Sequence, residues 1–169
     1  RKCTSFWYAQ LAGWFGLVLS ACSFGEEQTL PLSTIQVDGE ERAYYLYSPT
    51  NSMSGATPAL LLAFHGGGGI GVKFPQQEQF EALADQEHIM IAFPQAKPRE
   101  NNEGSWLLNS GPQRQQDIRF IAALIEKLTT QSDGADPKRV YATGYSLGSM
   151  FSYEMACHLD GKFAAIASY

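Results

Sequence analysis

Basic residues are scarce in this sequence. Its 169 residues include 12 Lys and Arg against 17 Asp and Glu, which gives a formal net charge of −5. No cluster of lysine or arginine runs along any expected helix or strand, and recognition of nucleic acid depends on such a cluster. We therefore exclude nucleic acid as an expected partner. Internal repeats and low-complexity tracts are also absent, so a single folded domain of ordinary size is expected.

A hydrophobic run long enough to span a membrane is also missing. The apolar run over residues 6–19 is interrupted only by Gln10, and a transmembrane helix needs about 20 apolar residues. Two basic residues precede the run, and the small residues Ser20 and Ala21 follow it, which is the order found in a secretory signal peptide. Residues 1–21 are therefore expected to direct export.

Cysteine is rare, with three in the chain. Residues 19–22 read LSAC and resemble the bacterial lipoprotein box, which implies lipidation of Cys22 and a membrane anchor through that lipid. A tether over residues 22–33 would then lead to a folded domain over residues 34–169. The alternative is an ordinary cleavable signal followed by a chance cysteine. After export Cys157 would be the remaining thiol, either buried or paired with a cysteine outside these residues.

The rest of the chain alternates between apolar runs of strand length and segments of helical period. Asp38 and Gly39 predict a hairpin turn between two strand-rich runs. Three continuous apolar runs predict buried strands over residues 59–64, 88–94 and 140–145, and a fourth strand is expected over residues 163–168. Three segments predict helices over residues 74–87, about 118–128 and 147–159. Strands that alternate with helices indicate the α/β class, a mostly parallel sheet with helices on both faces.

One serine lies between two glycines after the strand expected over residues 140–145. In GYSLG, residues 144–148, Ser146 would occupy a tight turn between strand and helix, exposed at the C-terminal edge of the sheet. The glycines would relieve crowding in that turn, and the N–H groups of the following helix would face developing negative charge. The motif alone is a weak signal in a chain with 16 glycines. A second element is needed before Ser146 can be interpreted as a nucleophile.

That second element follows the strand expected over residues 59–64, where His65 precedes four glycines. Glycines allow backbone N–H groups to approach a reacting carbonyl, as an oxyanion hole requires. A phosphate-binding loop and a flexible loop are the alternatives. The phosphate interpretation lacks the lysine and the Ser or Thr of a P-loop, because Ile70, Gly71 and Val72 follow instead.

Together these stretches resemble the α/β-hydrolase superfamily, and more narrowly the secreted esterases grouped as polyhydroxybutyrate depolymerases and feruloyl or acetylxylan esterases. The matching stretches are LLLAFHGGGG, FEALADQEHIMIAFPQA, GSWLL, DIRFIAALIEKL, RVYATGYSLGSMFSYEMACHL and FAAIAS. The resemblance implies the N-terminal part of an α/β-hydrolase fold and ester hydrolysis through an acyl-enzyme on Ser146, without cofactor or metal. It also implies an oxyanion hole formed by the N–H of Leu147 and that of Gly67 or Gly68.

A serine nucleophile also needs an acid and a histidine base, which follow the serine in this superfamily. His158 lies twelve residues along the same expected helix, about 18 Å from Ser146, and is too distant. His88 precedes a strand and so lies at the opposite edge of the sheet. His65 lies at the correct edge but lacks an orienting carboxylate, so a structural role in the glycine loop fits it better. We expect the acid and the base beyond Tyr169, and these residues alone to be inactive or nearly so.

The sequence also offers candidates for a substrate pocket and two alternatives to an esterase. His65, Tyr145 and Trp106 are candidates for a substrate pocket, although a loop tryptophan can equally cover the core. Asp117 falls in the first turn of a helix, where an acid is electrostatically favourable without any catalytic role. A serine peptidase and a non-catalytic binding or degenerate protein use the same fold and stay open as alternatives. The ester cleaved and the oligomeric state are not indicated.

Overall fold

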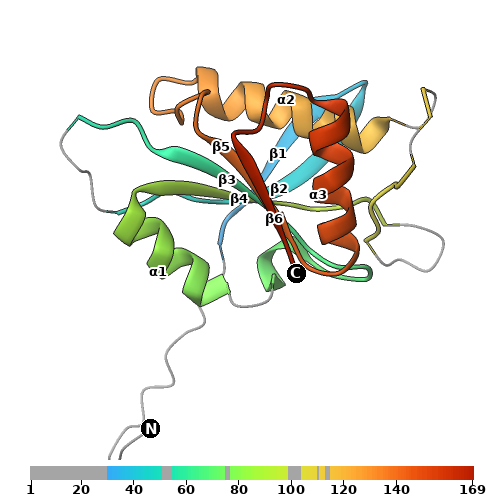
Figure 1. The fold of residues 1–169 in the computed structure, drawn as a ribbon, viewed down its shortest axis with the longest axis horizontal. Helices are drawn as coiled ribbons and strands as arrows, with labels where there is room; N and C mark the ends of the chain where they lie inside the picture. The colour runs from blue at the N-terminus through green and yellow to red at the C-terminus, as the bar shows by residue number, and fades with distance from the viewer. Residues whose placement is uncertain (1–29, 51–54, 75–76, 99–103, 110, 113–114) are drawn as a thin grey trace, which may run out of the picture.

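The computed structural model describes residues 30–50, 55–74, 77–98, 104–109, 111–112 and 115–169. The expected signal peptide, Cys22 and most of the expected tether lie outside these residues. The centre of the described part is a six-stranded sheet in the order β1-β2-β4-β3-β5-β6 (Figure 1). Its strands are β1 (Leu32–Val37), β2 (Glu40–Tyr47), β3 (Ala59–Phe64), β4 (Ile89–Pro94), β5 (Val140–Gly144) and β6 (Ala165–Ser168).

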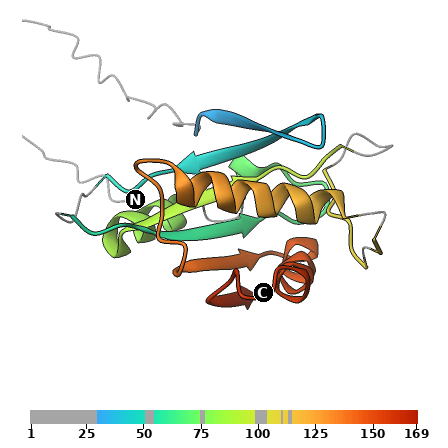
Figure 2. The same cartoon turned by 90° about the horizontal axis from the view of Figure 1, so that it is seen from above.

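The pairing of the strands is mostly parallel. β1 and β2 form an antiparallel hairpin and β2 pairs antiparallel with β4, whereas β4, β3, β5 and β6 are mutually parallel. The helices are the 3₁₀ helix η1 (Gly71–Lys73), α1 (Gln77–Glu87), α2 (Gln116–Thr130) and α3 (Leu147–His158). Figures 1 and 2 show α2 and α3 on one face of the sheet and α1 on the other. The predicted α/β architecture is confirmed.

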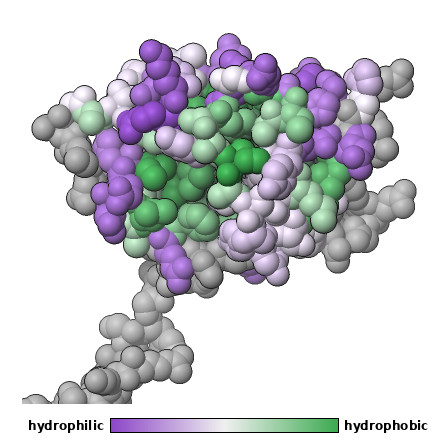
Figure 3. All heavy atoms as spheres, in the orientation of Figure 1, coloured by the Kyte–Doolittle hydropathy of each residue, from purple (hydrophilic) through white to green (hydrophobic). Residues whose placement is uncertain are grey.

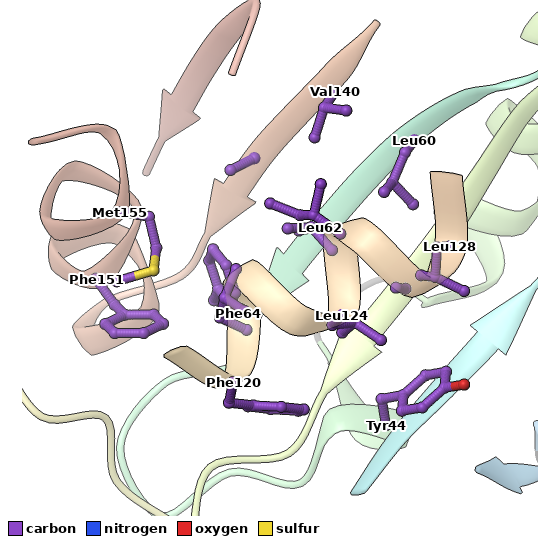
Figure 4. Packing of buried hydrophobic residues seen from close by; sticks show 14 of the residues in the cluster. Tyr44, Leu60, Leu62, Phe64, Phe120, Leu124, Leu128, Val140, Phe151 and Met155 are labelled. Carbon is purple, nitrogen blue, oxygen red and sulfur yellow. The ribbon is translucent and has the colours of Figure 1, made fainter. Parts of the chain in front are cut away.

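The core is built by the alternation of side chains along the central strands. Leu60, Leu62 and Phe64 of β3 are fully buried in the cluster that α2 and α3 cover, while Ala63 belongs to the cluster on the α1 face. Figure 4 shows the side chains of β3 directed towards Leu124 and the other apolar residues of α2. Full burial of a leucine or phenylalanine contributes about 1.5–3 kcal/mol relative to exposure. This two-sided burial explains why β3 is a continuous apolar run rather than an alternating one.

The course of the chain around β3 determines where a site can form. After β3 the chain returns as β4 on one side of β3, and after β4 it crosses to become β5 on the other side. In open α/β sheets, ligands bind beyond the C-terminal ends of strands at such a reversal. Phe64, the last residue of β3, is in register with Gly144, the last residue of β5. The loops that follow these two strands therefore start side by side.

Some predicted boundaries differ from the structure. The helix expected from residue 74 begins at Gln77, because Phe74 ends η1 in an extended conformation with its side chain buried. β1 begins at Leu32, which pairs with Tyr45 in the hairpin, so two residues assigned to the tether belong to the sheet. The final strand begins at Ala165 rather than at residue 163. These shifts leave the order of elements unchanged.

Cys157 is exposed, so the expectation of a buried thiol is wrong. The buried side of α3 is formed by residues such as Phe151 and Met155. Cys157 follows Met155 by two positions, which is roughly 200° around a helix, and so faces the opposite side. A disulfide to a cysteine outside these residues stays a prediction. No helix in the described ranges has the length and hydrophobicity needed to cross a bilayer.

One face of the sheet next to α1 is open and apolar. A groove of about 270 Å³ lies over β3, β5 and β6, and its lining includes Leu61, Phe80, Tyr141 and Ile166. Figure 3 shows apolar atoms gathered on this side of the molecule. On the α2 and α3 face of β3, by contrast, Leu60, Leu62 and Phe64 are fully buried.

Candidate active site

Ser146 occupies the turn that joins β5 to α3. Its backbone has φ 52° and ψ −116°, and it is the residue that precedes the first helical position of α3. A non-glycine residue held in such a conformation costs about 1–3 kcal/mol and persists only where surrounding structure enforces it. The serine is exposed at the C-terminal edge of the sheet. Strain of this kind at an exposed serine is typical of a nucleophile turn.

The two flanking glycines are required by close packing. A Cβ atom placed on Gly144 would lie 2.2 Å from the backbone of Gly148, and one placed on Gly148 would lie 2.1 Å from the carbonyl oxygen of Phe64. The obstructing atoms are backbone atoms, so no side-chain rotation can remove the overlap. The prediction that these glycines relieve crowding is confirmed, and it identifies β3 as the element that the start of α3 contacts.

The hydrogen bonds of the turn leave one N–H group next to the serine. The N–H of Gly148 donates to the carbonyl of Tyr145 at 2.9 Å, and the N–H of Ser149 donates to the carbonyl of Ser146 at 3.0 Å. Within the described ranges nothing accepts a hydrogen bond from the N–H of Leu147, which as the first helical residue has no acceptor inside α3. This N–H also lies at the positive end of the helix dipole.

The glycine loop after β3 lies against this turn. A Cβ atom on Gly66 would be 3.6 Å from Cβ of Ser146, and one on Gly67 would be 3.6 Å from Cδ2 of Leu147. These are ordinary contact distances, so the backbone of the loop is adjacent to the serine without overlapping it. The structure thus brings together the two elements that the sequence separates by about eighty residues.

Of the two glycines expected as alternative oxyanion donors, the structure leaves Gly67. The N–H of Gly68 donates to the carbonyl of Gly104 at 2.9 Å. The expectation that Gly68 is an alternative donor is therefore not met, because its N–H is already engaged with the segment before Trp106. No described residue accepts a hydrogen bond from the N–H of Gly67. The N–H groups of Gly67 and Leu147 therefore stay the two candidate oxyanion donors from the sequence analysis.

His65 is a buried structural residue. Only 1% of it is exposed, and its Nε2 atom lies 3.1 Å from the N–H nitrogen of Ala96. Since Ala96 must donate there, Nε2 accepts and the ring hydrogen is on Nδ1, which lies 2.7 Å from the carbonyl oxygen of Gly66. Burial lowers the pKa of His65 and so favours the neutral ring. With the ring buried and both nitrogens engaged, the structure favours a structural role for His65 in the glycine loop over its assignment as a pocket residue.

Trp106 supports the same loop from the core. Its ring is 3% exposed and stacks on the ring of Phe151 at a centroid distance of 4.5 Å. Its indole N–H donates to the carbonyl of His65 at 2.9 Å. The structure therefore favours the core-covering interpretation of Trp106 over the pocket interpretation. Tyr145 is 46% exposed beside the serine and stays a candidate for substrate contact.

A buried ion pair that the sequence analysis missed anchors the segment after Trp106. Arg42 of β2 lies 2.7 Å from Oδ1 of Asp117, and both side chains are almost fully buried. Oδ2 of Asp117 accepts the N–H of Leu107 at 2.9 Å, and the guanidinium of Arg42 lies 4.2 Å from the centre of the Phe120 ring. The helix-dipole interpretation of Asp117 was therefore incomplete. The sequence does hold a signal for the burial of Arg42. Arg42 lies two residues before Tyr44 in β2, and residues two apart in a strand face the same side of the sheet.

The remaining histidines lie away from the serine. Nε2 of His88 is 2.8 Å from the carbonyl oxygen of Ala56, beside the start of β4 and so at the opposite edge of the sheet. His158 pairs with Glu154 at the far end of α3. No described histidine contacts Ser146. The described residues also contain no cluster of three potential metal ligands.

Comparison with known proteins agrees with this geometry. The solved acetyl xylan esterase of Aspergillus awamori superposes with a TM-score of 0.66 at 23% identity, over 80% of this chain and 50% of that protein. The chain has the α/β-hydrolase fold. Within this fold, the strained serine directly follows β5 and the glycine loop directly follows β3, at the same edge of the sheet.

Several sequence relatives are named as esterases. The chain is 28% identical over 129 residues to a bifunctional acetylxylan esterase/xylanase of Neocallimastix patriciarum, covering 76% of this chain and 18% of the relative. It is 28% identical over 130 residues to feruloyl esterase B of Talaromyces stipitatus, covering 74% of this chain and 34% of the relative. The chain thus spans half or less of the length of each of these three proteins. No protein-family model matches the chain.

Proposed function

We propose that these residues form the nucleophile-bearing part of a serine esterase. The observation that carries the proposal is the strained, exposed Ser146, whose neighbouring glycines leave no room for a side chain. The adjacent N–H groups of Leu147 and Gly67 and the esterase names of the sequence relatives support it further. A turn that only joined a strand to a helix would not need a strained residue at the sheet edge.

The geometry supports acyl transfer in two steps. Oγ of Ser146 attacks the ester carbonyl carbon while a base removes its proton, and the N–H groups of Leu147 and Gly67 donate to the oxyanion that forms. The tetrahedral intermediate then collapses, the alcohol leaves with the proton from the base, and an acyl-enzyme remains. Water, deprotonated by the same base, hydrolyses the acyl-enzyme to the acid and restores the serine.

The base and its orienting acid come from outside these residues in this proposal. No described histidine reaches Ser146, and the chain spans only part of its relatives. We therefore expect the 169 residues alone to be inactive or nearly so, with at most the residual catalysis that oxyanion donors and binding supply without a base. The protein from the complete gene should supply the missing acid and histidine, in that order.

The substrate class follows from the names of the relatives. Acetyl and feruloyl esters of plant polysaccharides are the favoured substrates, and hydroxybutyrate esters follow from the family resemblance alone. Export rests on residues 1–21, and an anchor at the membrane rests on lipidation of Cys22. Recovery of a Cys22→Ser variant in the membrane fraction, at the level of the wild-type protein, would contradict the anchor.

A substrate panel tests the proposal on the protein from the complete gene. We expect hydrolysis of p-nitrophenyl acetate, acetylated xylan or methyl ferulate, and loss of that activity by at least about 10³-fold in Ser146→Ala. A peptide panel separates the peptidase alternative, since amide cleavage without ester selectivity would favour it. An inactive wild-type protein that unfolds cooperatively would favour the non-catalytic binding protein instead.

A further inference from the structure

We propose that Gln95 is a positioning residue for the oxyanion loop, defined here as residues 65–71. The inference rests on the proposed function, because it assigns a role in the same site. Gln95 directly follows β4, the strand beside β3, and its N–H donates to the carbonyl of Ala43 at 2.9 Å. Its backbone is therefore fixed to the sheet, which gives the side chain a rigid base next to the loop.

Both the oxygen and the nitrogen of the Gln95 side-chain amide form hydrogen bonds with the oxyanion loop. Its Oε1 atom accepts the N–H of Gly71 at 2.8 Å. Its Nε2 atom donates to the carbonyl oxygens of Gly69 at 3.3 Å and Ala96 at 3.1 Å. Exchanging the amide oxygen and nitrogen would place a donor against an N–H and an acceptor against two carbonyls, so these contacts determine the orientation of the amide.

The loop depends on such outside contacts because it has few side chains of its own. Glycine loses more conformational freedom on folding than other residues, and four successive glycines have no side chain that could pack them in place. The loop is instead held by Trp106 at His65, by Gly104 at Gly68 and by Gln95 at Gly69. Gly67, the candidate donor, lies between these attachment points.

Gln95 also connects the loop to the His65 ring. Nε2 of Gln95 lies 3.3 Å from Nε2 of His65, the same atom that accepts the N–H of Ala96. A Cβ atom on Gly104 would lie 2.6 Å from the amide nitrogen of Gln95, so the amide packs closely against the backbone of Gly104. The distance between the N–H groups of Gly67 and Leu147 thus depends on where the Gln95 amide holds the loop.

The first test replaces Gln95 with methionine, which has similar length and volume but cannot make these hydrogen bonds. In the protein from the complete gene, we expect Gln95→Met to lower kcat on p-nitrophenyl acetate by roughly 10- to 100-fold, with KM within about twofold of wild type. Gln86→Met is the matched control, because Gln86 is exposed on α1 and its side chain bonds, among the described residues, to its neighbour Glu87. A folded Gln95→Met protein with wild-type kcat would overturn the proposal.

The second test uses a pH profile that a purely structural role would not alter. In Gln95→Glu, a carboxylate would face the carbonyl oxygens of Gly69 and Ala96 and could donate to neither. Protonation restores one donor, so we expect the ratio of kcat for Gln95→Glu to kcat for wild type to rise as the pH falls. The ratio cancels the titration of the catalytic base, which both proteins share. A flat ratio, measured well below both melting temperatures, contradicts the proposal.

Hydrogen exchange separates this inference from the proposed function, because it requires no activity. We expect amides of residues 66–71 to exchange at least about fivefold faster in Gln95→Met than in wild type or Gln86→Met. Unchanged exchange overturns the positioning role, whatever the protein catalyses. Faster exchange in a protein that cleaves no ester supports the positioning role and counts against the esterase.

Discussion

The turn at Ser146 and the oxyanion loop are both rich in glycine and meet at one edge of the sheet, but different forces hold them. In the turn, Gly144 and Gly148 have backbone atoms within 2.2 Å of where a Cβ would lie. In the loop, Gly69 and Gly71 also have backbone atoms 2.9 and 2.8 Å from where a Cβ would lie, but the nearest atom to a Cβ on Gly67 is 3.6 Å away. Steric exclusion therefore fixes the turn, whereas Gly67 is held only through the hydrogen bonds that its neighbours in the loop make to residues outside it. Glycine serves close packing at Gly144 and Gly148 and access to a backbone N–H group at Gly67.

The largest effect that separates the two cases is expected from Gly148→Ala. Its Cβ would overlap the carbonyl oxygen of Phe64, and relief requires α3 to move away from β3. We expect a loss of about 4 kcal/mol or more in the free energy of unfolding, measured by urea denaturation. Gly67→Ala is the matched control and should change stability by less than about 1 kcal/mol. Equal stabilities for the two alanine variants would contradict the steric account of the turn.

A smaller effect is expected from Trp106→Phe, which removes the indole N–H but keeps an aromatic ring against Phe151. The lost hydrogen bond to the carbonyl of His65 should cost about 1–2 kcal/mol of stability. Because that bond holds the start of the oxyanion loop, kcat on an ester should also fall while KM changes little. Tyr153→Phe is the control, since Tyr153 is exposed on α3. Unaltered kcat in a stable Trp106→Phe protein would remove Trp106 from the support of the loop.

The smallest effect concerns pH and His65. Burial places the pKa of His65 in the folded protein below the ordinary value of 6.5, so the unfolded chain takes up this proton at higher pH than the folded protein does. Stability contributed by the neutral ring is therefore complete above about pH 6.5 and declines as the pH falls below it. His65→Asn should show a shallower loss of melting temperature between pH 7.5 and 5. Parallel losses in both proteins would assign the pH dependence to other groups.

The fold could be predicted from local sequence patterns, but the hydrogen bonds and ion pairs around the site could not. The apolar runs of β3, β4 and β5 and the spacing of GYSLG were sufficient to predict the sheet, its mostly parallel direction and the tight turn at Ser146, whereas the strained backbone of that serine was visible only in the structure. The N–H of Gly68 is engaged by the carbonyl of Gly104, so Gly67 and not Gly68 has an N–H group available for an oxyanion. This hydrogen bond joins two loop segments, and no periodic pattern in the sequence relates them. The same holds for Arg42 and Asp117, which are 75 positions apart and pair only because α2 crosses the hairpin. Contacts of this kind depend on tertiary packing.

The most direct test of the central claim is covalent labelling of the protein from the complete gene with a fluorophosphonate, followed by peptide mass spectrometry. A phosphonylated serine mimics the tetrahedral intermediate, so labelling requires both an activated nucleophile and oxyanion donors. The account predicts stoichiometric modification of Ser146, no modification in Ser146→Ala, and slower labelling in Gln95→Met than in Gln86→Met. A folded protein that stays unlabelled while a control serine hydrolase reacts fully, or that is labelled at another serine, would contradict the claim that Ser146 is the nucleophile.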